Sequence, residues 1–176
     1  MNRTKLVSEE EAEGLVEEIY GGIKKDFGGV PNLFKALAVK PGILKANLEK
    51  VKSIMMTGDL DRTLKEMVAV VVSEANGCDY CVGAHSAFLN QLGVKEETIN
   101  EVLTDIDSAD ISKKRKKILN FAVQSTTNPH QISDAEFNQI KELGFTDAEI
   151  VELVSVIDLF TSFNIFLDTL EVQLDL

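Results

Sequence analysis

The sequence of 176 residues has no tryptophan, and it has only three prolines, two cysteines and two histidines. Two cysteines cannot form a framework of several disulfides, nor can they supply four thiolates to a structural zinc site. Basic residues are also few, because 18 lysines and arginines stand against 29 aspartates and glutamates, giving a net charge of −11. That charge argues against nucleic acid or an anionic membrane as the main partner.

Long apolar segments are scarce as well. We see no apolar run that approaches the roughly 20 residues of a membrane-spanning helix. The opening segment MNRTKLVSEEEAEG turns acidic where a signal peptide needs its apolar core. We therefore expect a cytoplasmic protein without a membrane partner. In that reducing compartment, two cysteines favour a redox or catalytic role over a structural disulfide.

The remaining composition is that of a globular protein, with 44% hydrophobic and 27% charged residues, and the length suits a single domain over 1–176. Apolar residues recur at helical spacing and no segment alternates as a strand would, so we expect an all-α fold. Capping boxes predict helix starts at three places. They pair Ser8 with Glu11, Ser133 with Glu136, and Thr146 with Glu149.

Apolar residues predict how these helices are buried. Asp61 is expected to cap the helix that carries Glu66. That helix is apolar on nearly every side and runs to about Asn76, which indicates a central, enclosed helix. The run KKRKK at 113–117 is interpreted as the solvated side of another helix rather than as a nucleic-acid patch. The expected inward residues of the first and third helices are Leu15, Val16, Ile19, Ile23, Ile43, Leu44, Leu48, Val51 and Ile54.

The residues with chemical potential gather between positions 66 and 85. Cys78 and Cys81 are three residues apart, and His85 follows four residues later. Gly77 is expected to end one helix, so that another starts at Cys78. At about 100° per residue, positions 78, 81 and 85 then lie within about 60° on one helix face. The free N–H groups and positive dipole at a helix start favour thiolate there.

Glu66 stands within an apolar run, which is an unusual place for a carboxylate. Burial raises the pKa of such a carboxyl group unless the group is paired, and a raised pKa would suit a proton carrier. A Cys₂His metal site completed by Glu66 or by water is an alternative reading of the same residues. On dipole grounds Cys78 is favoured as the first thiolate, although either cysteine could attack a substrate first.

The spacing Glu66–x₁₁–Cys78–x₂–Cys81–x₃–His85 resembles the signature of the alkylhydroperoxidase AhpD-like family. That family belongs to the carboxymuconolactone decarboxylase superfamily, and the segment SEANGCDYCVGAHSAFL is most similar to its peroxidase-related branch. The core signature covers 61–92. The resemblance implies an all-α AhpD-like bundle with the CxxC pair at the N-terminus of a central helix, assembled as a homotrimer or homohexamer.

The resemblance also implies a function. Cys81 would reduce a hydroperoxide and become a sulfenic acid, Cys78 would resolve it as a disulfide, and an external dithiol would reopen the bond. His85 would accept the thiol proton, and Glu66 would orient and charge-balance His85, so that the two continue a proton relay toward Cys78 and Cys81. The family needs no metal or organic cofactor, and its electrons can come from a lipoylated carrier protein.

This chain departs from the pattern between the cysteines, where Asp79 and Tyr80 replace a serine and a second histidine of the well-studied alkylhydroperoxidase. Two other functions stay open. One is a lyase like carboxymuconolactone decarboxylase, against which the cysteine pair argues, because such a lyase has no need of it. The other is a non-catalytic redox sensor whose disulfide changes its assembly.

Overall fold

The computed structural model describes residues 2–175, and in that part of the chain every regular element is helical. The all-α prediction is therefore confirmed. Met1 and Leu176, the two ends of the predicted domain 1–176, lie outside the described residues. The helices are α1 (Leu15–Phe27), α2 (Asn32–Leu37), α3 (Pro41–Met55), α4 (Arg62–Asn76), α5 (Asp79–Gln91), α6 (Glu96–Thr104), α7 (Lys113–Thr127), the 3₁₀ turn η1 (Pro129–Gln131), α8 (Asp134–Glu142) and α9 (Asp147–Thr169).

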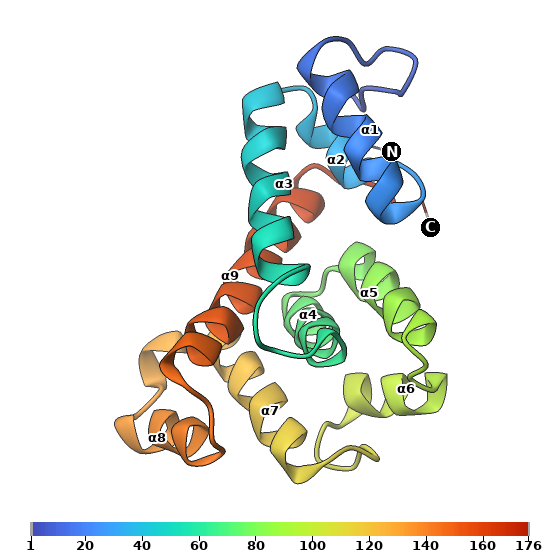
Figure 1. Ribbon diagram of the computed structural model, residues 1–176. Helices are drawn as coiled ribbons and strands as arrows, with labels where there is room; N and C mark the ends of the chain where they lie inside the picture. The colour runs from blue at the N-terminus through green and yellow to red at the C-terminus, as the bar shows by residue number, and fades with distance from the viewer. Residues whose placement is uncertain (1, 176) are drawn as a thin grey trace.

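Helix α4 lies at the centre of the molecule. It packs against α5, α7 and α9, which surround it in Figure 1, and all residues from 64 to 73 are buried. Helices α1–α3 form a second group that packs on the C-terminal half of α9, close to the first turn of α5. The two ends of the chain meet beside this group, where the Arg3 N–H donates to the Leu170 carbonyl at 2.8 Å. The predicted enclosed helix is thus the core of the fold.

Most predicted helix starts are confirmed by their caps. Asp61 accepts a hydrogen bond from the Leu64 N–H at 2.9 Å, and both boxes at Ser133 and Thr146 are complete. The helix start predicted at Ser8 is wrong, although the predicted capping box forms. Ser8 and Glu11 make both capping-box hydrogen bonds, yet these close an isolated turn. Helix α1 begins only at Leu15, after Gly14 with φ of 57°.

The predicted inward faces are right in part. Leu15 and Ile43 are 41% and 50% exposed, so these two assignments are wrong, whereas Tyr20 is buried without having been predicted. The Tyr20 hydroxyl explains its burial, because it donates to the Val7 carbonyl and fixes the N-terminal segment on α1. The basic run at the start of α7 faces solvent wholly or in part, while Ile118, Leu119, Phe121 and Ala122 face the core.

Helix α9 corrects one expectation about apolar segments. Its 23 residues are long and apolar enough for a membrane span by length and composition. Half of its most apolar stretch is buried inside the fold, however, as in the core helix of a globular protein. Phe160 and Phe163 lie in that buried half, whereas Phe166 is half-buried, so the first two are core residues.

A buried ion pair fixes the loop between α3 and α4. Lys65, which is 2% exposed, pairs with Glu152 of α9 and also donates to the carbonyls of Ile54 and Thr57. Glu152 in turn accepts hydrogen bonds from the N–H groups of Asp59 and Leu60. This network holds the end of α3 over the start of α4, next to the candidate site.

Candidate functional site

A tight turn places the two cysteines at the start of α5. Gly77 ends α4 in the left-handed region with φ of 74°, and the Cys78 N–H donates back to the Ser73 carbonyl at 2.9 Å. Gly77 suits this position because a side chain would strain such a backbone. Cys78 is the N-cap of α5 and Cys81 lies in its first turn. Both thiols are free, and both residues are buried.

The two thiols influence each other strongly. Hydrogen bonding from the Cys81 thiol is the main influence that lowers the pKa of Cys78, and the Cys81 backbone N–H adds to it against the effects of burial and Asp168. The same hydrogen bond raises the pKa of Cys81, as do burial and the negative charge on Cys78. The lowered pKa of Cys78 and the raised pKa of Cys81 favour the thiolate at Cys78, in the direction that the helix dipole favours.

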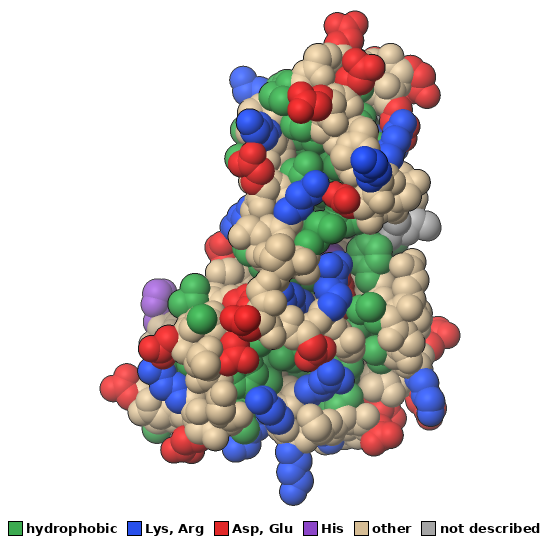
Figure 2. All heavy atoms as spheres, viewed as in Figure 1, with side chains coloured by type: hydrophobic (Ala, Val, Ile, Leu, Met, Phe, Trp, Pro, Cys, Tyr) green, Lys and Arg blue, Asp and Glu red, His purple; other side chains and the backbone are tan. Residues whose placement is uncertain are grey.

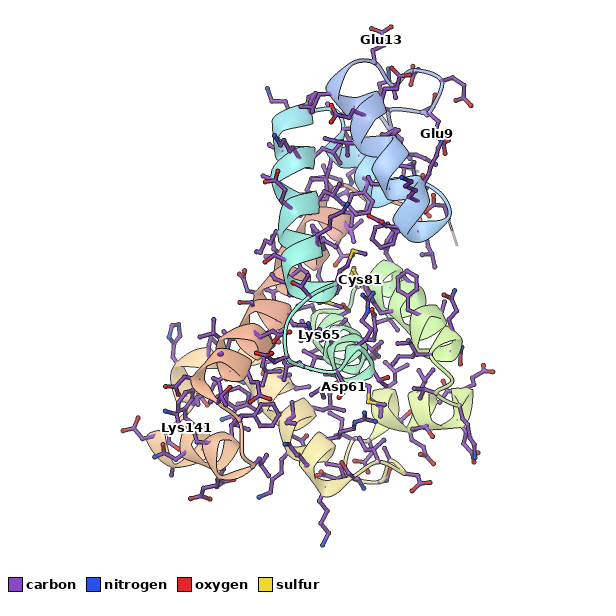
Figure 3. All side chains as sticks on the ribbon, viewed as in Figure 1. Glu9, Glu13, Asp61, Lys65, Cys81 and Lys141 are labelled. Atoms are coloured by element: carbon purple, nitrogen blue, oxygen red, sulfur yellow. The ribbon has the colours of Figure 1, made fainter. Side chains whose placement is uncertain are left out.

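A cavity opens onto Cys81 rather than onto Cys78. Its volume is about 690 Å³ including the open mouth, and it lies between the α1–α3 group and α5 and α9. Figure 2 shows hydrophobic side chains at the surface in this region. Figure 3 shows Cys81 where the α1–α3 group meets the helices around α4. The lining residues are Phe27, Pro31, Leu33, Phe34, Val51, Met55, Met56, Arg62, Tyr80, Cys81, Ala84, His85, Phe88, Leu159, Phe160 and Phe163.

His85 lines the same cavity one turn after Cys81, and Glu66 holds its ring. Nδ1 of His85 lies 2.5 Å from Oε2 of Glu66, which is fully buried on α4. The imidazole also meets the edge or face of Phe160 and Phe88, with ring centroids 4.4 and 5.5 Å apart. With Nδ1 occupied, Nε2 is the ring nitrogen left for exchange of a proton with a substrate or thiol.

Arg62 occupies the other oxygen of Glu66. Its Nε donates to Oε1 of Glu66 at 2.6 Å, and its Nη1 donates to the Met55 carbonyl at 2.9 Å. Burial would raise the pKa of Glu66, but the charges and hydrogen bonds of His85 and Arg62 outweigh it and lower the pKa. Glu66 is thus a paired carboxylate, the case in which burial alone was not expected to raise the pKa. The raised pKa expected for an unpaired carboxyl group, which would suit a proton carrier, is therefore wrong for Glu66, and its lowered pKa favours the carboxylate form.

The same pairing bears on metal binding. Both oxygens of Glu66 are engaged by His85 and Arg62, so this carboxylate is not free to complete a Cys₂His site. Within residues 2–175, no three side chains among His, Cys, Asp and Glu converge as metal ligands do. The arrangement is suited to moving protons and to thiol chemistry.

Four residues of the site were not assigned from the sequence. Arg62 stands four residues before Glu66, a spacing that places the two on one helix face and could have revealed the pair. Ser73 and Asn164 hydrogen-bond each other beside Cys81, and no spacing links them in the sequence. Tyr80 accepts from the Leu33 N–H and donates to Asp175, so it anchors α2 and the C-terminal segment.

Comparisons with known proteins bear on the family of this chain. The carboxymuconolactone decarboxylase family matches residues 41–110, which contain all four predicted site residues. The alkyl hydroperoxide reductase Rv2159c of Mycobacterium tuberculosis is 30% identical over 93 residues. That match covers 53% of this chain but only 27% of the relative, so the chain spans about a quarter of that protein's length.

Two solved structures share the fold over nearly the whole chain. The AhpD-core, peroxidase-related protein of Ralstonia eutropha JMP134 has a TM-score of 0.90 and 26% identity, covering 99% of this chain and 92% of its own. A variant of the debrominase Bmp8 has a TM-score of 0.85 at 18% identity, covering 98% of this chain and 91% of its own, and so shows the fold alone. The family match over residues 41–110 and the full-length likeness to the Ralstonia eutropha protein agree with the resemblance of residues 61–92 to the AhpD-like, peroxidase-related branch of the carboxymuconolactone decarboxylase superfamily.

Proposed function

We propose that this protein is a thiol-dependent hydroperoxide reductase that works through a dithiol–disulfide cycle. The observation that carries the proposal is the position of Cys81, which lies between an apolar cavity on one side and Cys78 on the other. His85, held by Glu66, lines that same cavity. An apolar hydroperoxide in the cavity would thus meet a sulfur nucleophile, a proton carrier and a resolving thiol together.

The first half of the cycle takes place at Cys81. His85 accepts the Cys81 proton, and the sulfur attacks the terminal oxygen of the hydroperoxide, so that an S–O bond forms and the O–O bond breaks. The departing alkoxide takes the proton from His85 and leaves as an alcohol. Cys81 is then a sulfenic acid, oxidised by two electrons. Glu66 stabilises the imidazolium that exists between the two proton transfers.

The second half uses Cys78. Its lowered pKa makes it the thiolate of the pair, which suits it to attack the Cys81 sulfur. An S–S bond forms, and the hydroxyl of the sulfenic acid leaves as water with one proton. An external dithiol then reduces the disulfide by exchange and supplies the two electrons and two protons that the peroxide consumed. A lipoylated carrier is the proposed source of that dithiol.

Assembly and location complete the proposal. Val151, Val154 and Ile165 are 66%, 44% and 65% exposed and lie on one side of α9, since their positions fall within about 60° of one another on the helix. Such a face suits contact with further copies of the chain, and we propose a cytoplasmic homotrimer or homohexamer. Light scattering with Ile165→Glu against the parent tests this, because a charge on the face would lower the assembly mass.

Consumption of a hydroperoxide with a dithiol as reductant tests the activity. We expect repeated turnover by the parent and complete loss in Cys81→Ser. Cys78→Ser should oxidise once and then stall, because no second thiol closes the cycle. A redox sensor would instead oxidise once even in the parent, and a lyase would work without either thiol. Turnover that survives in both variants would rule the mechanism out.

A further inference from the structure

Two polar side chains are buried where α4, α5 and α9 meet, outside the groups named so far in the mechanism. Ser73 is fully buried and Asn164 is 1% exposed. Asn164 lies on the apolar helix α9, between the buried residues Phe163 and Leu167. Burial of an amide or hydroxyl group lowers the stability of the fold unless the group makes its hydrogen bonds. The stability of this junction therefore depends on the hydrogen-bond partners of these two side chains.

Their hydrogen bonds run in one direction. The Asn76 side-chain amide, at the exposed end of α4, donates to Oδ1 of Asn164 at 2.9 Å. The Asn164 amide nitrogen donates to Oγ of Ser73 at 3.0 Å. Because Asn76 occupies the amide oxygen, the NH₂ group of Asn164 must face Ser73. The Ser73 oxygen thus receives a hydrogen bond, and its own proton is free to be donated elsewhere.

The chain of hydrogen bonds runs from Asn76 through Asn164 to Oγ of Ser73, and Cys81 lies beside its buried end. Ser73 and Asn164 both lie within hydrogen-bonding reach of Cys81, and both favour its ionised form. Among the described residues, the Ser73 hydroxyl donates to no oxygen atom. The Ser73 carbonyl also accepts from the Cys78 N–H, so one residue of α4 contacts both members of the pair.

We propose that Ser73 and Asn164 supply the hydrogen bonds that stabilise the Cys81 thiolate, and that Asn76 is a positioning residue that orients the Asn164 amide. This role rests on the proposed function and adds a part to it. Burial and the negative Cys78 both oppose charge on Cys81, so its anion needs compensation. Neutral donors provide that compensation, and because neither Ser73 nor Asn164 lines the cavity, they leave it free for substrate.

A merely structural link between α4 and α9 is the competing explanation, and titration of Cys81 separates the two. The background is Cys78→Ser, which leaves one thiol, and the readout is the ultraviolet absorbance of thiolate against pH. The other ionisable groups near the pair are His85 and Tyr80 on α5 and Asp168 on α9, and all three stay unchanged.

Removal of one donor should shift the titration midpoint of Cys81 upward by about one pH unit, a roughly tenfold smaller thiolate fraction, because a hydrogen bond to a charged group is worth about 1.5–3 kcal/mol. Ser73→Ala and Asn164→Ala test the two donors. Asn76→Ala should give a smaller upward shift, and its exposed position makes loss of folding no concern. Ser73→Thr keeps the hydroxyl group and should therefore keep the titration midpoint of the Cys78→Ser parent.

Ser155→Ala is the matched control, because this α9 hydroxyl donates to the Val151 carbonyl of its own helix. It should leave the midpoint unchanged. The proposal is overturned if Ser73→Ala, Asn164→Ala and Asn76→Ala all keep the midpoint of the Cys78→Ser parent, whatever they do to thermal unfolding. Since the titration requires no peroxide, its outcome is separate from the outcome of the turnover test.

Discussion

Oε2 of Glu66 lies 2.5 Å from Nδ1 of His85, so a fully buried carboxylate on α4 fixes the imidazole that lines the cavity on α5. If this contact orients and charge-balances the proton carrier, Glu66→Gln should lower kcat for hydroperoxide by about tenfold or more. His85→Gln should cost about 100-fold, within the range typical of general acid–base groups. The double variant should be no worse than His85→Gln, since the two residues act as one unit.

Steady-state kinetics measures these effects, with circular dichroism to confirm folding. A Glu66→Gln protein with the parent kcat would show that the contact serves the fold and not the reaction.

The ion pair with Arg62 predicts a pH dependence. The pKa of Glu66 is lower in the folded protein than in the unfolded chain. The stabilising carboxylate is therefore fully present at a pH above the unfolded-state pKa, and it is lost as the pH falls through the folded-state pKa. Arg62→Met removes two of the lowering influences while burial, which raises the pKa, remains. The acid limb of activity should therefore move to higher pH in Arg62→Met, and less so in Arg62→Lys.

Activity measured from pH 4 to pH 7 tests this shift (about the range in which a carboxyl group with a raised pKa titrates). Arg3→Met is the control, because Arg3 pairs with Glu171 on the surface. An unmoved acid limb in Arg62→Met would contradict the assignment.

The dithiol predicts a coupled titration. In the reduced protein, one thiolate should form below the pKa of an ordinary cysteine, because Cys81 hydrogen-bonds the Cys78 sulfur. The second thiol should stay protonated while the first is charged. Cys78→Ser removes the largest influence on Cys81, whose pKa should then fall relative to the parent. Thiolate absorbance follows both steps, and two independent ionisations at an ordinary cysteine pKa would contradict the coupling.

The buried Lys65–Glu152 pair predicts a stability effect. Lys65→Met would leave Glu152 without its counter-ion in a site where the lysine is 2% exposed, and it should cost about 3 kcal/mol of unfolding free energy. Lys45→Met is the matched control, since Lys45 and Glu49 form an exposed pair at 4.0 Å and the change should stay within about 0.5 kcal/mol. Urea denaturation compares the two, and equal losses would show that the buried pair has no special weight.

Local sequence patterns accounted for much of the fold. Caps at Asp61, Ser133 and Thr146 act within one turn, so their residues alone reveal them. Ser8 misled because its hydrogen bonds close a turn whether or not a helix follows, and Gly14 delays the helix. Exposure of Ile43 could not be foreseen, because it depends on which neighbour covers α3.

The site divides in the same way. Cys78, Cys81 and His85 share one helix, so their spacing was enough to bring them together. The contact of Glu66 with His85 came from the family signature, because it crosses between α4 and α5. Asn164 could not be found from either source, since it reaches Cys81 from α9, more than 80 positions along the chain.

Intact mass spectrometry of Cys78→Ser after one equivalent of hydroperoxide tests the central claim most directly. We predict that this variant gains the mass of one oxygen atom, at Cys81. Over the same reaction time, Cys81→Ser should show no gain in mass. The parent should instead lose the mass of two hydrogens as its disulfide forms. Oxygen retained on Cys78 in Cys81→Ser, with Cys78→Ser unchanged, would mean that the sulfur facing the cavity is not the one that attacks.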